Sequence, residues 1–220
     1  GDFPSKNTFT WNGHFRDDLR RFWKGDKDTA WNMSDKIKGT PSIYKEDNIF
    51  PKSINFITSH DGFTLKDLVT FNRKHNFANR EQNRDGDNHN NSWNHGTEGP
   101  TTNLLINDLR KRQQKNLILS LLISKGVPMI LMGDEIGRSQ GGNNNSWCQN
   151  NLLGWMNWEH GQQDLELLEY FKYVIKIRKK LINIFNPSIT PNNQTNENIP
   201  TYHWHGTKLD SPDWSSWSHT

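Results

Sequence analysis

Two short apolar runs in this chain lead directly into acidic residues. Residues 54–58 run into Ser59-His60-Asp61-Gly62, and residues 127–132 run into Gly133 and then Asp134-Glu135. Apolar runs of this length are typical of strands buried on both faces, as in a parallel sheet. Catalytic residues of α/β barrels and doubly wound folds commonly follow such strands. The pattern therefore predicts two strands whose acidic loops meet at one edge of a sheet.

Three segments have the apolar spacing of amphipathic helices. Residues 15–24 carry apolar side chains three and four positions apart and are followed by Gly25, a typical C-cap. Residues 109–125 become apolar in their second half and end at Gly126. Residues 165–184 form the third predicted helix. The helix at 109–125 lies between the two predicted strands, which indicates a right-handed βαβ unit.

The remaining segments are polar. Residues 25–53, 59–108 and 133–163 read as irregular, and loops this long inside a compact domain are usually functional. Residues 187–200 have the Pro, Asn and Thr content of a linker. Residues 201–206 resemble the first strand of a new, all-β unit.

Composition narrows the class of protein. Only 31% of the residues are hydrophobic, yet 10 Trp and 11 Phe argue against a disordered chain. A net charge of +3 gives no reason to expect nucleic acid or a membrane surface as a partner, and no apolar run approaches the ~20 residues of a membrane span. The single cysteine, Cys148, excludes an internal disulfide, which fits a reducing compartment and equally fits chance. The opening residues resemble the middle of a longer protein, so we expect preceding segments.

The acidic loops offer candidate chemistry, each with a structural alternative. Asp61 suits a general base, a nucleophile or a stabiliser of positive charge, and His60 suits a hydrogen bond to a hydroxyl. The alternative is that His-Asp-Gly is simply a turn. Asp134 and Glu135 likewise suit either a site or an ion pair with Arg138 that fixes the loop.

The loops are also rich in planar amides and indoles. Residues 141–149 and 81–86 combine Asn, Gln, Gly and Arg with nearby Trp147 and Trp93, the side chains that bridge sugar hydroxyls and cover sugar C–H faces. The alternative is a composition biased towards Asn throughout. No metal is expected, because the histidines lack ligand spacing and the Asp85 loop has Gly96 where an EF-hand needs Glu.

Taken together, these segments resemble the isoamylase-type glycogen debranching enzymes of the α-amylase superfamily (glycoside hydrolase family 13). The matching segments are residues 11–22, 53–65, 81–86, 98–101, 133–140, 142–145, 204–209 and 212–214. The resemblance implies an α/β fold, the C-terminal part of a (β/α)8 TIM barrel followed by an all-β domain. Residues 1–186 would form about barrel units 6 to 8, residues 187–200 a linker, and residues 201–220 the start of a C-terminal β-sandwich.

The resemblance also implies a function, which is hydrolysis of α-1,6-glucosidic branch linkages by a retaining mechanism. Asp61 matches the family's transition-state stabiliser, and His60 matches the histidine that binds the sugar at the cleavage site. The nucleophile and the acid/base of the family lie on earlier strands, so the chain alone is expected to be inactive. The residues expected to bind substrate are His60, Asn83, Arg84, Asp134, Glu135, Arg138, Asn143, Asn144 and Asn145.

The implied partner is a branched α-glucan such as glycogen, limit dextrin or amylopectin, with no cofactor and a cytoplasmic or plastid location. Two alternatives stay open: a non-catalytic glucan-binding fragment, and a branching or trehalose-forming relative. An isolated fragment that is unstable is a third. The chain departs from the family at Asn150, where Asp is usual, and at His95, where Cys is common.

Overall fold

A computed structural model describes residues 8–44, 52–158, 164–182 and 204–205. The described residues fall into two compact units. The first unit takes its residues from 1–56, 120–129 and 174–220, and the second from 57–119 and 130–173. Within the described ranges, no helix combines the length and the apolar character needed to cross a membrane.

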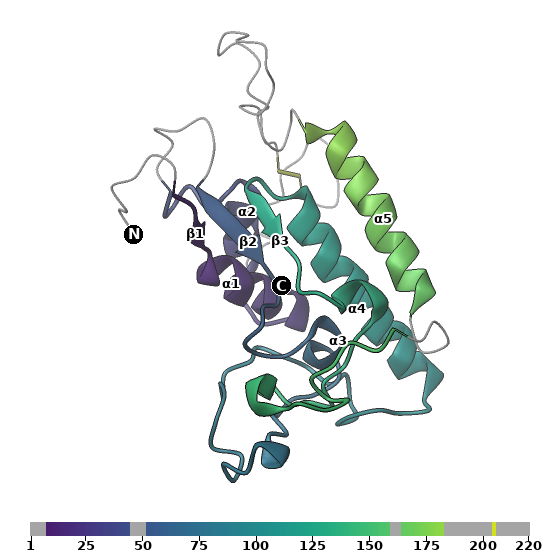
Figure 1. Ribbon diagram of the computed structural model, residues 1–220. Coiled ribbons are helices and arrows are strands. Elements are labelled where there is room, and N and C mark those ends of the chain that lie inside the picture. Colours follow the sequence, from purple (N-terminus) through teal and green to yellow (C-terminus); the bar gives the residue numbers. More distant parts are fainter. Residues whose placement is uncertain (1–7, 45–51, 159–163, 183–203, 206–220) are drawn as a thin grey trace, which may run out of the picture. The chain divides into compact units, whose positions relative to one another are not determined.

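The first unit contains a three-stranded parallel sheet (Figure 1). Its strands are β1 (Thr10–Trp11), β2 (Ser53–Phe56) and β3 (Val127–Met129), in the order β1-β2-β3. Trp11 pairs with Ile54, and Ile54 pairs in turn with Val127. The parallel pairing of the two predicted strands is confirmed. Both strands are shorter than the apolar runs that predicted them. An apolar run indicates which residues are buried, and residues can stay buried where the strand pairing has ended. Ile57, the residue after β2, is an example.

Helix α1 (Gly13–Lys24) confirms the first predicted helix and begins two residues earlier than the apolar spacing indicated. The earlier start comes from Asn12, whose side chain accepts a hydrogen bond from the Phe15 amide at 2.9 Å. Phe15 and Leu19 are fully buried. Gly25 ends the helix with φ of +90°, as its predicted C-cap role requires.

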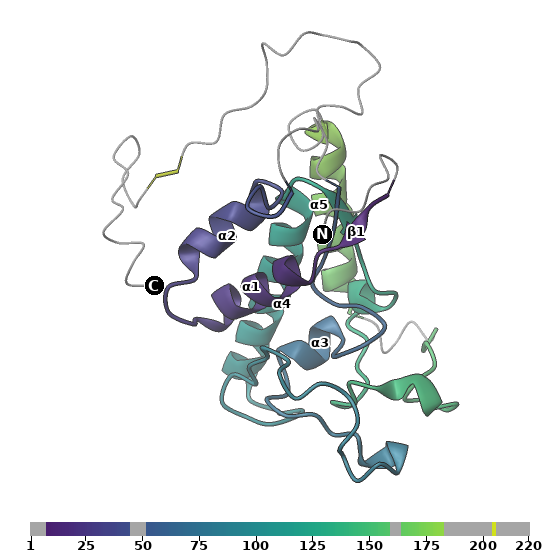
Figure 2. The same ribbon diagram turned by 90° about the vertical axis from the view of Figure 1, so that its left-hand side faces the viewer.

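Helix α2 (Ala30–Ile37) lies in a segment that was predicted to be irregular. It runs beside α1 (Figure 2) and buries Ala30 and Met33 together with the polar Ser34 and Lys36. So few apolar positions leave no clear helical period in the sequence, which is why the helix was missed.

The two other predicted helices are also present, and both are long. Helix α4 (Leu104–Ile123) begins before the predicted residue 109, because Asn103 caps it by accepting from the Leu105 amide at 3.0 Å. Helix α5 (Leu165–Lys180) confirms the third predicted helix. In the first unit, the Arg178 guanidinium on α5 donates to the carbonyls of Ser124 and Gly126 at 2.9 and 2.7 Å, which ties the end of α5 to the segment entering β3.

The second unit is built mainly from the two long polar segments. They contain the short helix α3 (Leu65–Leu68) and single 3-10 turns at Phe77–Asn79, Asp134–Ile136 and Ser146–Cys148. The predicted linker at 187–200 lies outside the described residues, and so does the strand predicted at 201–206 apart from Trp204 and His205, which have no regular structure. The proposed domain boundaries therefore stay predictions.

Candidate functional site

The loop after β2 presents His60 and Asp61 to solvent. Their side chains are 70% and 78% exposed, and His60 Nε2 lies 3.0 Å from Asp61 Oδ1. The backbone turns at Gly62, which has φ of +101° and donates its N–H to the Asn144 carbonyl at 2.9 Å. The segment is therefore a turn that needs glycine, as the structural alternative expected. It also presents an exposed histidine–carboxylate pair, whose role in catalysis stays a prediction.

Asp134 lies in the interior of the second unit. It is 1% exposed and accepts hydrogen bonds from the Thr58 hydroxyl and, at 2.9 Å, from the Leu65 amide. Burial raises the pKa of Asp134 to about 7; the two hydrogen bonds oppose the rise, and the nearby carboxylates of Glu135 and Asp67 add to it. The structure thus places this predicted substrate-binding residue beneath the surface.

Glu135 and Arg138 make contacts that fix their own loop. Glu135 Oε2 accepts from the Gly133 amide at 2.8 Å, and Arg138 Nη2 donates to the Gly154 carbonyl at 2.7 Å. Both side chains are half-buried. Both contacts hold the loop through backbone groups, whereas the structural alternative expected an ion pair between the acidic residues and Arg138.

The amides of Asn143 and Asn144 are buried in a network that joins two loops distant in sequence. Asn143 and Asn79 exchange side-chain hydrogen bonds of 2.8 and 3.3 Å. Asn144 Nδ2 donates to Asn90 Oδ1 at 2.8 Å, and its Oδ1 accepts from Asn76 at 2.8 Å. Asn144 therefore uses its amide to hold the loop in place.

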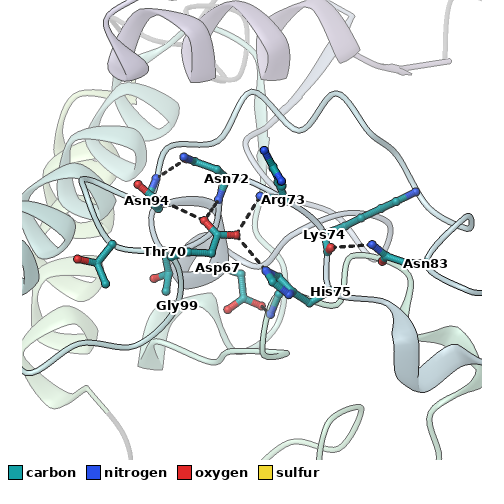
Figure 3. Close-up of polar contacts among 12 residues, drawn as sticks. Asp67, Thr70, Asn72, Arg73, Lys74, His75, Asn83, Asn94 and Gly99 are labelled. Carbon is teal, nitrogen blue, oxygen red and sulfur yellow. Dashed lines mark hydrogen bonds and ion pairs between the residues drawn. The ribbon is translucent and has the colours of Figure 1, made fainter.

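Asn145 and Asn83 extend the same network. Asn145 Nδ2 donates to Asp85 Oδ2 at 3.0 Å. Asn83 Oδ1 accepts from the Asn76 amide at 2.7 Å, and its Nδ2 donates to the Lys74 carbonyl at 3.2 Å (Figure 3). Both side chains are only partly buried, so one edge of each reaches the surface.

Arg84 differs from these amides because its side chain is exposed. Its backbone is fixed by Lys74, whose ammonium group donates to the carbonyls of Arg84, Asp85 and Gly86 at 2.7–3.2 Å. The guanidinium has one long contact to the Glu81 carbonyl, 3.4 Å from Nε. Arg84 is thus a cation presented on a firmly held loop.

Glu98 is an organising residue that sequence reasoning did not single out. Its carboxylate accepts from the Asn72 and Arg73 amides at 2.8 and 3.1 Å and from the side chains of His75 and Asn94 at 2.9 and 2.8 Å (Figure 3). Burial raises its pKa, but these four donors outweigh burial and lower the pKa to about 2. In the sequence, Glu98 stood out only as part of residues 98–101, one of the segments that resemble the isoamylase family.

The second unit also exposes several indoles. Trp147, Trp155 and Trp158 are 84%, 54% and 71% exposed. Trp155 Nε1 donates to Asn150 Oδ1 at 3.0 Å, so Asn150 supplies the acceptor that an Asp would also supply there. Among the described residues, no group of three or more His, Cys, Asp or Glu is arranged to hold a metal ion.

The sequence is similar to plant isoamylases and bacterial debranching enzymes. It is 41% identical over 220 residues to isoamylase 1, chloroplastic, of Oryza sativa. The aligned residues make up 99% of this chain and 26% of that protein. It is 38% identical over 223 residues to the glycogen debranching enzyme of Erwinia tasmaniensis, covering 100% of this chain and 33% of that protein. Over nearly its whole length, the chain therefore resembles isoamylases and glycogen debranching enzymes. No protein-family model matches it.

A third relative and a solved structure give two further comparisons. The glycogen operon protein GlgX homolog of Mycobacterium tuberculosis is 46% identical over 180 residues, which is 81% of this chain and 25% of that protein. A pullulanase from Bacillus acidopullulyticus superposes with a TM-score of 0.56 at 20% identity, covering 80% of this chain and 19% of the other. At that identity the likeness shows the fold alone, which is α/β. The chain thus spans about a quarter to a third of these curated relatives.

Proposed function

We propose that the protein containing this chain hydrolyses α-1,6-glucosidic branch linkages in an α-glucan with retention of configuration. The observation that carries the proposal is the exposed His60–Asp61 pair in the loop that follows β2, in a chain similar over nearly its whole length to isoamylases and glycogen debranching enzymes. Asp61 stabilises the positive charge of the oxocarbenium-like transition state. His60 donates a hydrogen bond to a hydroxyl of the sugar at the cleavage site.

A retaining hydrolase also needs a nucleophile and an acid/base, carboxyl groups about 5–5.5 Å apart. We place both on strands that precede β1 in the barrel, outside this chain. The share of the relatives that the chain covers, 25–33%, supports this assignment. In this proposal the chain supplies about barrel units 6 to 8 and the beginning of a C-terminal β-domain.

The contacts revise which side chains we expect to touch the glucan. His60, Asp61 and Arg84 are exposed, and so is the Trp147 indole, whose face suits a sugar C–H face. Asp134, Asn143 and Asn144 are buried, so we propose that they act through the loops they hold. We propose glycogen or a related branched glucan as the substrate, in the cytoplasm or a plastid, and the relatives include an isoamylase named as chloroplastic.

The proposal is tested on the full-length protein that contains this chain. Incubation with glycogen should release linear α-1,4-linked chains and new reducing ends, and proton NMR of the fresh product should show the α-anomer first. Linkage analysis separates the alternatives, because a branching enzyme creates α-1,6 linkages and a trehalose-forming relative creates no such chains. Unchanged glycogen would refute the proposed function.

A further inference from the structure

One carboxyl group holds both ends of the loop that carries His60 and Asp61. The loop begins at Thr58, two residues after β2 ends at Phe56, and it ends at Leu65, the first residue of α3. Asp134 accepts from the Thr58 hydroxyl with one oxygen and from the Leu65 amide with the other, at 2.9 Å. Closing both ends on a single group restricts the backbone conformations open to the residues between them.

A third contact fixes the middle of the same loop. The Gly62 amide donates to the Asn144 carbonyl at 2.9 Å, and the buried Asn144 side chain is held by Asn76 and Asn90. The segment that follows β3, residues 134–144, therefore contacts the loop at its start, its centre and its end. All of these contacts lie within the second unit.

The burial of Asp134 separates it from the residues that could meet substrate. At 1% exposure it cannot touch a glucan, whereas His60 and Asp61 are 70% and 78% exposed. A buried carboxyl destabilises a fold unless its hydrogen bonds compensate, and an apolar side chain could fill the same space without that penalty. What an apolar side chain could not supply is the pair of directed bonds to Thr58 and Leu65.

We propose that Asp134 is a positioning residue for the reaction, holding His60 and Asp61 in place through the two ends of their loop. This inference rests on the proposed function, since it assigns Asp134 a part in the same chemistry. It predicts that Asp134 acts on the catalytic step more than on glucan binding, because Asp61 interacts most strongly with the transition state. Misplacing a catalytic group by about 1 Å is enough to lower a rate about 10²-fold.

The test compares Asp134→Ala with Asp134→Asn in the full-length protein, using release of reducing ends from glycogen. Ala removes both hydrogen bonds, and we expect kcat to fall about 10²-fold with KM changed less than about threefold. Asn restores both bonds, since its oxygen accepts from Leu65 and its amide donates to the Thr58 hydroxyl. We therefore expect the Asn variant to keep kcat within about threefold of wild type.

The matched control is Asp164→Asn, which changes a carboxylate of the same unit whose hydrogen bond, 3.0 Å from the Leu167 amide, caps α5 rather than holding Thr58 or Leu65. It should leave kcat unchanged. Thr58→Val serves if the Ala variant does not fold, because it removes one of the two bonds at similar volume and should lower kcat about tenfold.

The outcomes are distinguishable. An inactive wild-type protein refutes the proposed function. An active wild type with unchanged kcat in Asp134→Ala, or in Thr58→Val where that variant is the one tested, refutes the positioning role and leaves the function standing. Equal losses in the Ala and Asn variants also overturn the inference, because they would show that the charge, and not the two hydrogen bonds, is what the loop requires.

Discussion

Asp61, Asp134 and Glu98 carry the same functional group in three different environments. Asp61 is exposed, Asp134 is buried with a pKa raised to about 7, and Glu98 is held by four donors with a pKa lowered to about 2. The sequence pointed to Asp61 because it directly follows a strand. It did not separate Asp134 from the substrate-binding residues, because burial is imposed by the loops that pack over it, and periodicity does not report on loops.

Replacing Asp134 with Asn should change how stability depends on pH. The unfolded chain ionises this carboxyl near its ordinary pKa of about 4, whereas the folded protein keeps the proton up to about pH 7. The group's contribution to stability is complete below about pH 4 and is lost as the pH rises through about 7. Asn has no such loss, so the free energy of unfolding of the variant should improve relative to wild type between about pH 4 and 7 in urea titrations. A difference that stays constant with pH would contradict the assignment.

Replacing Glu98 with Gln should show the opposite pH dependence. Its folded pKa of about 2 lies below the unfolded value, so its contribution is present above about pH 4.5 and is lost as the pH falls towards 2. At pH 7 we expect Glu98→Gln to lower the free energy of unfolding by about 1–3 kcal/mol, because Gln leaves donors such as the Asn72 amide without a full set of acceptors. The deficit should shrink at low pH. An equal deficit at pH 7 and pH 3 would rule out this account.

At the scale of elements, the sequence predicts best where apolar spacing and caps agree. Helix α1 shows both, with Phe15 and Leu19 on its buried face and Gly25 at its end. Helix α2 lacks a clear apolar period and was missed. The loop network was beyond prediction because its partners, such as Asn76 and Asn144, are 68 residues apart and their pairing depends on the folded loops.

The loop network predicts a specific sensitivity at Gly86. A Cβ there would lie 2.2 Å from Asn144 Oδ1 and 2.8 Å from Asn76 Nδ2, so Gly86→Ala must displace the buried amides. Gly141→Ala is a matched control, because Gly141 also has positive φ, +60° against +72°, but has no atom within 4 Å of its Cβ position. We expect Gly86→Ala to be less stable than Gly141→Ala by about 1–3 kcal/mol in thermal and urea unfolding. Equal losses of stability in the two variants would show that backbone strain at positive φ, and not the displaced amides, sets the cost of Gly86→Ala.

At the scale of the whole molecule, the chain matches only part of the length of its relatives. It spans 26% and 33% of the rice and Erwinia tasmaniensis relatives. Among the described residues, β1 and β3 each pair with β2 on one side only. Unpaired edges of this kind suit a sheet that continues into further strands, as the proposed barrel would require.

The isolated 220-residue chain should therefore release no reducing ends from glycogen, since the proposed nucleophile and acid/base lie outside it. The measurement is a reducing-end assay on the purified chain beside the full-length protein at equal concentration. Turnover by the isolated chain would overturn the proposal that the nucleophile and the acid/base lie outside it. Both carboxylates would then have to come from these 220 residues.

The most direct test of the central claim is Asp61→Asn in the full-length protein. We expect kcat on glycogen to fall by about 10²–10³-fold or more, because Asn keeps the size of the side chain and removes the charge that stabilises the transition state. Asp87→Asn is the control, since Asp87 is also exposed and, among the described residues, its carboxylate contacts His89 alone, accepting from the backbone amide at 2.7 Å and lying 3.8 Å from the imidazole Nδ1. A kcat for Asp61→Asn within about threefold of wild type, with the control equally active, would contradict the role assigned to Asp61.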